Sequence, residues 1–208
     1  MKVVRFLSVA LAVVALAVSA NSATANLLQN ASFESLLEYG DPDQPNWFAF
    51  FGAGSQGTFS TADGGFTGTP MPLTGSHNLS IENDGTPNGF SGVFQRVPVV
   101  AGTSYTFSFS AKDNSPGGSF PIGAEYRIEW LDGGGGVIGA TPNQPIAGSL
   151  TTSYQGFSIT DTAPVGAVRG QPVIAVETFS ASGATGILNV DDASFVVPEP
   201  ASVALAGF

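Results

Sequence analysis

The sequence predicts an all-β protein that folds as one antiparallel β-sandwich. After residue 25 no segment has the period of an amphipathic helix, whereas alternation of apolar and polar residues is common. The chain is rich in turn-forming residues, with 27 glycines and 14 prolines. Because only 11% of the residues are charged and 16 are phenylalanine, the composition is that of a packed domain rather than a disordered chain.

The clearest expected strand is 122–130, where apolar and polar side chains alternate. Its apolar positions are Ile122, Ala124, Tyr126, Ile128 and Trp130, and Gly123, Glu125, Arg127 and Glu129 lie on the other face. The other expected strands are 26–33, 47–51, 77–81, 89–97, 104–110, 157–159, 173–179 and 187–197. Ala101-Gly102 is expected to form a hairpin turn, 132–136 a flexible turn, and 61–76 a long surface loop.

The N-terminus has the features of a secretory leader. Lys2 and Arg5 form a basic region, 6–18 is apolar, and Ala23 and Ala25 form a small-residue cleavage signal. Cleavage there leaves a mature chain that begins at Asn26. We therefore expect a signal peptide at 1–25, one sandwich domain at 26–197 and a separate C-terminal segment at 198–208.

Composition limits the partners of the mature chain. Removal of 1–25 leaves four basic and 16 acidic residues, a net charge of −12. Such a surface repels nucleic acid and anionic lipid, which excludes both as expected partners, and its carboxylates can supply oxygen ligands for calcium. There is no cysteine, so the core must hold the domain together without disulfides, with or without help from a metal.

The C-terminal segment resembles a known sorting signal. Pro198, Glu199 and Pro200, followed by the apolar stretch 201–208, resemble the PEP-CTERM signal of bacterial surface proteins, which a membrane protease, an exosortase, is thought to process. In that family the apolar helix is longer and ends in arginines. Eight residues rise only about 12 Å as a helix, so the resemblance implies a truncated or degenerate signal. It also implies transient membrane contact through this tail, if the full tail exists.

Three segments of the domain resemble jelly-roll carbohydrate-binding modules with the galactose-binding-like fold. They are NLLQNASFE at 26–34, FQRVPVVAGTSYTFSF at 94–109 and LNVDDASF at 188–195. The match covers nearly the whole mature domain and keeps the family's order of motifs. It implies an antiparallel jelly roll whose first and last segments meet. It also implies polysaccharide binding, although the fold serves other roles too.

The same resemblance implies a structural calcium ion between the two chain ends. It assigns Glu34 as a side-chain ligand, Ser32 as a carbonyl ligand, and Asp191 or Asp192 as the residue that closes the site. Strand alternation points one of these aspartates inward and the other outward, so one of the two is expected to dominate. The alternative is that these acids are solvated residues at strand ends.

No catalytic signature is present, so we expect a protein that is not an enzyme. His77 is the only histidine, which excludes a histidine-rich zinc site. Glu125 and Glu129 share a strand face about 13 Å apart, beyond the roughly 5 to 9.5 Å of glycosidase pairs. The row Glu125, Arg127 and Glu129 is a better sugar-binding row than a catalytic pair, and its alternative is an ordinary solvated strand face.

Exposed aromatic rings are the other expected sugar contacts. Tyr39 and Tyr154 lie beside polar loop residues and are the best exposed candidates, whereas Trp47 and Trp130 are expected in the core. We therefore expect an exported, non-catalytic protein of the bacterial cell surface or extracellular matrix that binds polysaccharide. The alternatives are a structural or adhesive surface protein without specific sugar binding, and a secreted glycoside hydrolase.

Overall fold

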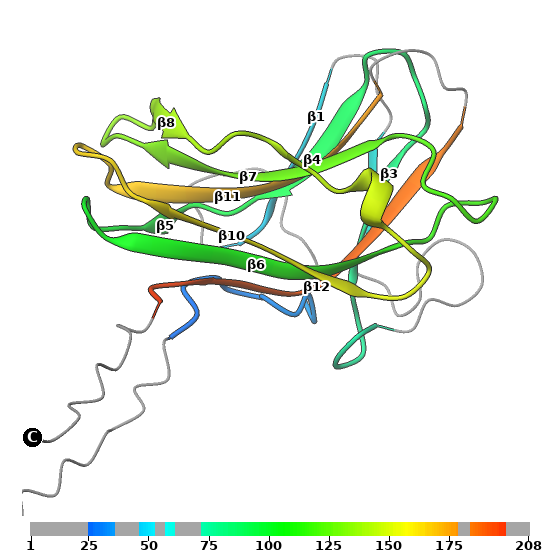
Figure 1. The fold of residues 1–208 in the computed structure, drawn as a ribbon, viewed down its shortest axis with the longest axis horizontal. Helices are drawn as coiled ribbons and strands as arrows, with labels where there is room; N and C mark the ends of the chain where they lie inside the picture. Colours follow the sequence, from blue (N-terminus) through cyan, green and yellow to red (C-terminus); the bar gives the residue numbers. More distant parts are fainter. Residues whose placement is uncertain (1–24, 36–45, 53–56, 61–71, 179–183, 199–208) are drawn as a thin grey trace, which may run out of the picture.

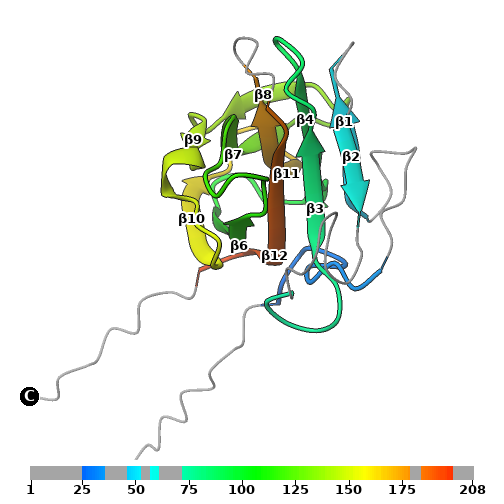
Figure 2. The same cartoon turned by 90° about the vertical axis from the view of Figure 1, so that its right-hand side faces the viewer.

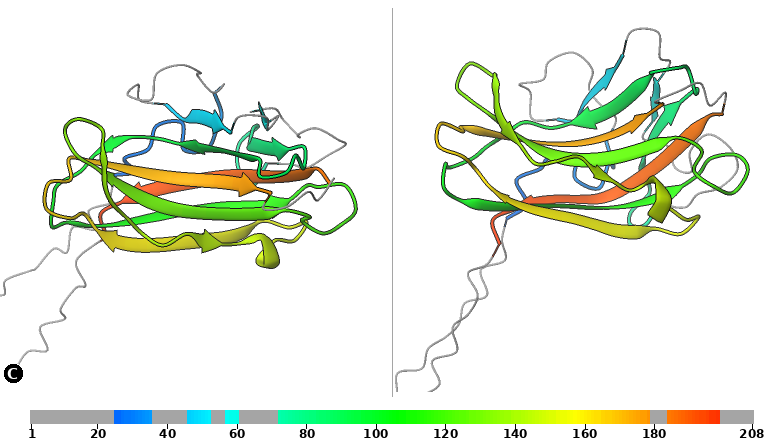
Figure 3. Two further views of the ribbon diagram at one scale, coloured as in Figure 1. Left: turned by 90° about the horizontal axis from the view of Figure 1, so that it is seen from above. Right: turned by 45° about the horizontal axis from the view of Figure 1, so that its top comes forward.

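The computed structural model describes residues 25–35, 46–52, 57–60, 72–178 and 184–198. They form two stacked antiparallel sheets, with β7 and β11 in one layer and β6 and β12 in the other (Figures 1 and 3). The sole helix in these ranges is the 3₁₀ turn Ala147–Ser149. Within the same ranges no helix has the length and apolar character to cross a membrane. The predicted all-β sandwich is therefore confirmed.

The first sheet has the strand order β1-β4-β11-β7-β8, with β5 paired to β11 and β9 paired to β7. Its strands are β1 (Phe48–Phe51), β4 (Phe90–Phe94), β5 (Val97–Pro98), β7 (Gly123–Leu131), β8 (Val137–Ala140), β9 (Gln144–Pro145) and β11 (Arg169–Glu177). Every pairing is antiparallel.

The second sheet has the order β10-β6-β12-β3-β2. Its strands are β2 (Gly57–Ser60), β3 (Leu79–Asn83), β6 (Ser104–Asp113), β10 (Gln155–Thr162) and β12 (Gly186–Val196). Figure 2 views the sandwich from one end, where β12, β3 and β2 lie side by side.

The core lies between the two sheets and is strongly aromatic. The rings of Tyr105 and Phe195 are stacked, with their centroids 5.3 Å apart. Those of Phe109 and Tyr126 pack edge to face, with their centroids 5.1 Å apart. The expectation that Trp47 and Trp130 belong to the core is confirmed, because both are buried. Since one face of each central strand fills this core, the opposite face of each sheet is left for other contacts.

The first segment is not the regular strand that its sequence predicts. Asn30 (φ 46°) and Phe33 (φ 55°) have left-handed backbone, which interrupts an extended strand. The segment nevertheless lies beside the end of β12, since the Leu27 amide donates to the Phe195 carbonyl at 2.9 Å. The Asn26 amide group donates to the Ala193 carbonyl, also at 2.9 Å. The predicted meeting of the two chain ends is confirmed.

The turn at Ala101-Gly102 is not the predicted hairpin. It connects β5 in the first sheet to β6 in the second, and the Gly102 amide (φ 80°) donates to the Ala163 carbonyl at 2.8 Å. Alternation identifies strands but not their partners, which explains the error. The short strands β2, β8 and β9 also lacked a periodic signal. Of the expected loop 61–76, the stretch 61–71 lies outside the described residues.

Candidate functional site

The face of the first sheet that points away from the core carries the row predicted on β7. Ile174 of β11 pairs with Val93 and with Tyr126, and all three belong to the core. Their sequence neighbours therefore point outward. Glu125 and Arg127 are such neighbours, and they share this outer face with phenylalanines from β1 and β4.

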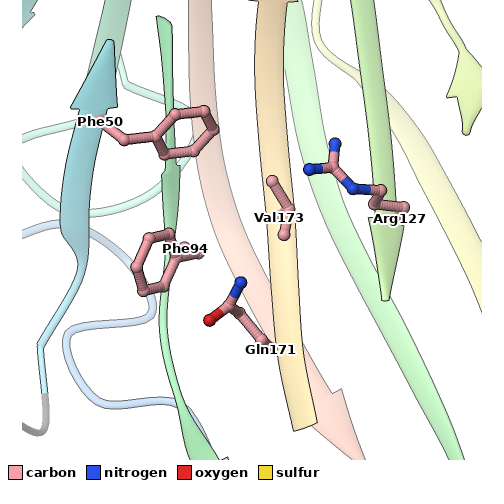
Figure 4. A pocket seen from close by; sticks show the side chains of 5 residues that line it. All are labelled: Phe50, Phe94, Arg127, Gln171 and Val173. Carbon is pink, nitrogen blue, oxygen red and sulfur yellow. The ribbon is translucent and has the colours of Figure 1, made fainter. Parts of the chain in front are cut away.

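Two adjoining hollows lie on this face, and together we call them the outer pocket. The larger has a volume of about 420 Å³ and is lined by Phe50, Phe90, Glu125, Arg127, Asn143, Ala175 and Glu177. The smaller has a volume of about 190 Å³ and is lined by Phe50, Phe94, Arg127, Gln171 and Val173. Figure 4 shows the smaller hollow, with Phe50 and Phe94 on one side of Val173 and Arg127 on the other.

Arg127 is held at the centre of a chain of polar contacts. Its Nη1 lies 3.0 Å from Glu125 Oε1, and its Nε lies 2.7 Å from Glu129 Oε1. Gln171 donates to Glu129 at 2.5 Å and accepts from Arg96 Nε at 2.7 Å. Glu125 is only 8% exposed, so this row is not the ordinary solvated face that the sequence left open as an alternative. It is a fixed polar wall.

Glu177 is a candidate site residue that sequence reasoning missed. It lies on β11, where the neighbouring Ala175 pairs with Glu125 of β7, so the two glutamates sit close together on the outer face. Burial raises the pKa of Glu177 to about 7, and the charge of Glu125 and a hydrogen bond with it add to the rise. Glu177 therefore takes up a proton near neutral pH.

Three phenylalanines form the aromatic side of the outer pocket. The Phe50 ring lies 5.9 Å from that of Phe94 and 6.2 Å from that of Phe90, measured between centroids. Phe94 is nearly buried, whereas Phe90 is 45% exposed. The alternation in FSGVF at 90–94 carries the signal, because it places Phe90 and Phe94 on one face.

Of the two tyrosines expected as sugar contacts, the structure describes only Tyr154. Tyr39 lies outside the described residues. Tyr154 precedes β10 in the second sheet, where the Lys112 amine lies 4.4 Å from the centre of its ring. Burial, and then the charge of Asp191, raise the pKa of Tyr154. Tyr154 is thus half-buried against the second sheet and does not line the pocket.

Three of the four residues predicted to bind calcium, Glu34, Asp191 and Asp192, contact residues 73–77, which we call the clasp loop. The Glu34 carboxylate accepts from the amides of Ser76 at 3.0 Å and His77 at 3.2 Å, and lies 3.4 Å from His77 Nδ1. The His77 amide is the main reason that the pKa of Glu34 is lowered. Ser32 lies in the same N-terminal stretch, two residues before Glu34.

The two aspartates hold the other half of the clasp loop. Asp191 Oδ2 accepts from the amides of Leu73 at 2.8 Å and Thr74 at 3.1 Å, and the Thr74 hydroxyl donates to Asp192 Oδ1 at 2.6 Å. Alternation alone would send Asp192 into the core, but the register shifts between Asp191 and Ser194 and Asp192 has φ 48°. This bulge keeps both acids out of the core, with Asp191 fully buried under the loop.

The carboxylates offer hard oxygens from both chain ends, which is the donor chemistry that calcium prefers. In the ranges that the structure describes, no three histidine, cysteine, aspartate or glutamate side chains are grouped to hold a metal. Backbone amides of the clasp loop occupy the Glu34 and Asp191 oxygens instead. A calcium ion would have to replace some of these amide contacts, so the calcium site stays a prediction.

Gly75 tests how tightly the clasp loop closes on Glu34. A Cβ at this position would lie 2.0 Å from Glu34 Oε1, and the residue has φ 64°. We expect Gly75→Ala to lower the melting temperature through both effects. Gly102→Ala is the matched control, because Gly102 has φ 80° and nothing within 4 Å of its Cβ position, and should cost only about 1 kcal/mol. Equal melting temperatures for the two variants would show that the Glu34 contact is unimportant.

Comparisons with known proteins support the fold. No protein-family model and no curated protein sequence matches the chain. The structure is similar to a putative sugar binding protein from Bacteroides thetaiotaomicron, with a TM-score of 0.55 and 14% identity over 84% of this chain and 100% of that one. It is also similar to a CBM4 structure, with a TM-score of 0.52 and 20% identity over 82% and 99% of the two chains.

A third similar structure is the enzymatically active domain of bacteriophage CBA120 tailspike protein 4. The TM-score is 0.59 and the identity 17%, over 83% of this chain but only 21% of the tailspike chain. This chain therefore spans about a fifth of that protein. The architecture resembles that of carbohydrate-binding-module β-sandwiches, and at these identities the likeness concerns the fold alone.

Proposed function

We propose that this protein is an exported, non-catalytic β-sandwich that binds polysaccharide in the outer pocket. The observation that carries the proposal is the pairing of a half-exposed aromatic ring, Phe90, with a fixed wall of polar groups around Arg127. Sugar rings present apolar faces that stack on aromatic side chains and hydroxyl edges that exchange hydrogen bonds. The likeness to carbohydrate-binding-module structures supports the same assignment.

The contacts within the wall hold Arg127 in place, which favours tight binding of a ligand. Arg127 is held by two carboxylates before any ligand arrives, so little side-chain entropy remains to be lost on binding. Asn143 adds an amide that can both donate to and accept from sugar hydroxyls. The aromatic rings supply the apolar contact on the opposite side of the pocket.

Phe90→Ala should weaken glycan binding at least tenfold, a loss of about 1.4 kcal/mol. The reason is the removal of the exposed stacking surface at the pocket. Affinity electrophoresis through gels containing soluble polysaccharides, followed by calorimetry with oligosaccharides of the retarding glycan, measures the effect. Phe51→Ala is the control, because Phe51 is 60% exposed and does not line either hollow. Equal affinity of the two variants would place the binding site elsewhere.

The geometry of the glutamates supports a role without catalysis. Glu125 and Glu129 both form ion pairs with Arg127, so both carboxylates are engaged in holding that guanidinium. Glu125 and Glu177 are hydrogen-bonded neighbours, whereas glycosidase carboxyl pairs stand at least about 5 Å apart to admit the sugar. Release of reducing ends from any glycan, abolished by Glu177→Gln, would favour the hydrolase alternative.

Export and sorting form the second part of the proposal. The leader at 1–25 and the motif at Pro198, Glu199 and Pro200 support delivery to the bacterial cell surface or matrix, with processing by an exosortase. Intact-mass measurement of the exported protein tests both, since the mature chain should begin at Asn26 and end near the motif. The structural or adhesive alternative predicts surface association without saturable binding of any oligosaccharide.

Calcium binding at the clasp loop is the third part of the proposal. Its support is the convergence of carboxylates from both chain ends on one short loop: Glu34 from the first segment, Asp191 and Asp192 from the last. Ser32 would add a carbonyl oxygen. A bound ion would staple the two ends of the domain together and supply stability, not chemistry on the sugar.

A further inference from the structure

The charged groups on the outer face alternate in sign along one path. The path runs from Arg96 through Gln171 to Glu129, then to Arg127 and on to Glu125. Each charge in it therefore contacts an opposite charge or a bridging amide. Such a path is balanced, and adding a ligand charge next to Arg96 or Glu129 would disturb contacts that already exist.

Glu177 breaks this balance. It follows Glu125 on the path, so two carboxyl groups adjoin where the alternation requires a cation. In the part of the chain that the structure describes, Glu177 forms no ion pair. Burial is the main reason that the pKa of Glu177 rises to about 7, and the negative charge of Glu125 and a hydrogen bond with it add to the rise.

The position that a cation would take lies inside the larger hollow. Glu125 and Glu177 both line it, as do Phe50, Phe90 and Asn143. Its volume of about 420 Å³ exceeds that needed for a bare ion and falls in the range of small-molecule sites. The ligand therefore needs three features: a positive group, an apolar face and hydroxyls.

A hexosamine residue with a free amine has all three features. We propose that the outer pocket selects polysaccharide containing de-N-acetylated amino sugars, with the protonated amine held between Glu125 and Glu177. This inference rests on the proposed function and narrows its ligand class. N-acetylation removes the charge, and a uronic acid would bring a carboxylate against two others.

The charge of Arg127 lowers the pKa of Glu177, but it is the weakest of the influences on that pKa, so it offsets the pair only in part. Arg127 is held by Glu125 and Glu129, Arg96 donates to Gln171, and Arg169 lies at the opposite end of β11 from Glu177. The described part of β1, Phe48–Phe51, contributes only phenylalanine and alanine. The negative charge is therefore local to the larger hollow.

Binding of an amine should depend on pH in a defined way. Below pH about 7 Glu177 is protonated, and this proton must leave before the ligand amine can take its place. Affinity should rise as the pH passes through 7, then fall where the amine loses its own proton. A neutral oligosaccharide should show no such bell-shaped dependence.

Calorimetry on the mature chain with four tetrasaccharides tests the proposal: those of glucosamine, N-acetylglucosamine, glucose and galacturonic acid. At pH 7 we expect the glucosamine tetramer to bind at least tenfold more tightly than the other three. Glu177→Gln should abolish this preference, because the amide lacks the charge that would hold the amine. Glu82→Gln is the control, because it removes one acid from β3 in the second sheet and tests for attraction by overall charge.

The outcomes distinguish a failure of amine selection from a failure of polysaccharide binding. Tighter binding of the glucose or N-acetylglucosamine tetramer would overturn the amine proposal and leave polysaccharide binding intact. No binding of these or of any polysaccharide in the gels would overturn both. An equal loss in Glu177→Gln and Glu82→Gln, with both variants folded by circular dichroism, would assign the preference to the net charge of the chain and overturn the site.

Discussion

Phe195→Ala should lower the free energy of unfolding by roughly 3–5 kcal/mol. Phe195 is fully buried in β12, stacks on Tyr105 at 5.3 Å and lies 6.4 Å from the ring of Trp130. Removal of the ring takes away its transfer free energy. It also leaves a cavity, because the strands packed on both sides relax only partly to fill the space. Because domains of this size are stable by only about 5–15 kcal/mol, one substitution should remove a large share of the total.

Urea unfolding followed by tryptophan fluorescence measures this loss, since Trp130 reports on the same cluster. Phe51→Ala is the control for the type of substitution, and its exposed side chain should make the change nearly neutral. A loss below about 1 kcal/mol in Phe195→Ala would mean that the two sheets do not close on this ring. The packing of the two sheets around Phe195 would then differ from that described above.

The sequence predicted those parts of the fold that depend on alternation along one strand. The expected strand 122–130 is β7 at Gly123–Leu131, and the expected 187–197 is β12 at Gly186–Val196. The pattern fixes which side chains face the core, because a one-residue slip would expose all of them. It does not fix which strands pair, so the turn at Ala101-Gly102 could not be read as a crossing between sheets.

For the same reason, the sequence could predict only those residues of the outer pocket that share one strand. Glu125, Arg127 and Glu129 share one strand, and their common face follows from spacing alone. Glu177 lies some fifty residues later in the sequence and meets Glu125 only through the register of β11 on β7. Phe50 joins the pocket through two further pairings, β1 to β4 and β4 to β11. Cross-strand neighbours of this kind are set by tertiary structure.

The clasp loop shows a different limit of sequence reasoning. The acids at Glu34 and Asp191 were identified, and the structure brings them to one loop. Their hydrogen-bond partners, the amides of 73–77, carry no side-chain signature in the sequence. The bulge at Asp192 was also invisible, because aspartate tolerates both extended and left-handed backbone.

Calcium should raise the melting temperature of the mature protein if it binds at the clasp loop. An ion present at a hundred times its dissociation constant stabilises the folded state by about 2.7 kcal/mol, which is a shift of several degrees in thermal unfolding. The measurement is a melting curve in calcium and another in excess chelator. Glu34→Gln should abolish the difference between them, because the amide loses the charge that attracts the ion.

The control for this experiment is Glu82→Gln, which lies on β3 away from the loop contacts and should keep the full shift. Identical melting curves with and without calcium would contradict the proposal. In that case the amides of the clasp loop alone would hold the two chain ends together, and Glu34→Gln should still destabilise the protein in chelator. The glutamine oxygen accepts the Ser76 and His77 amides more weakly than a carboxylate does, because the hydrogen bonds are no longer charge-assisted.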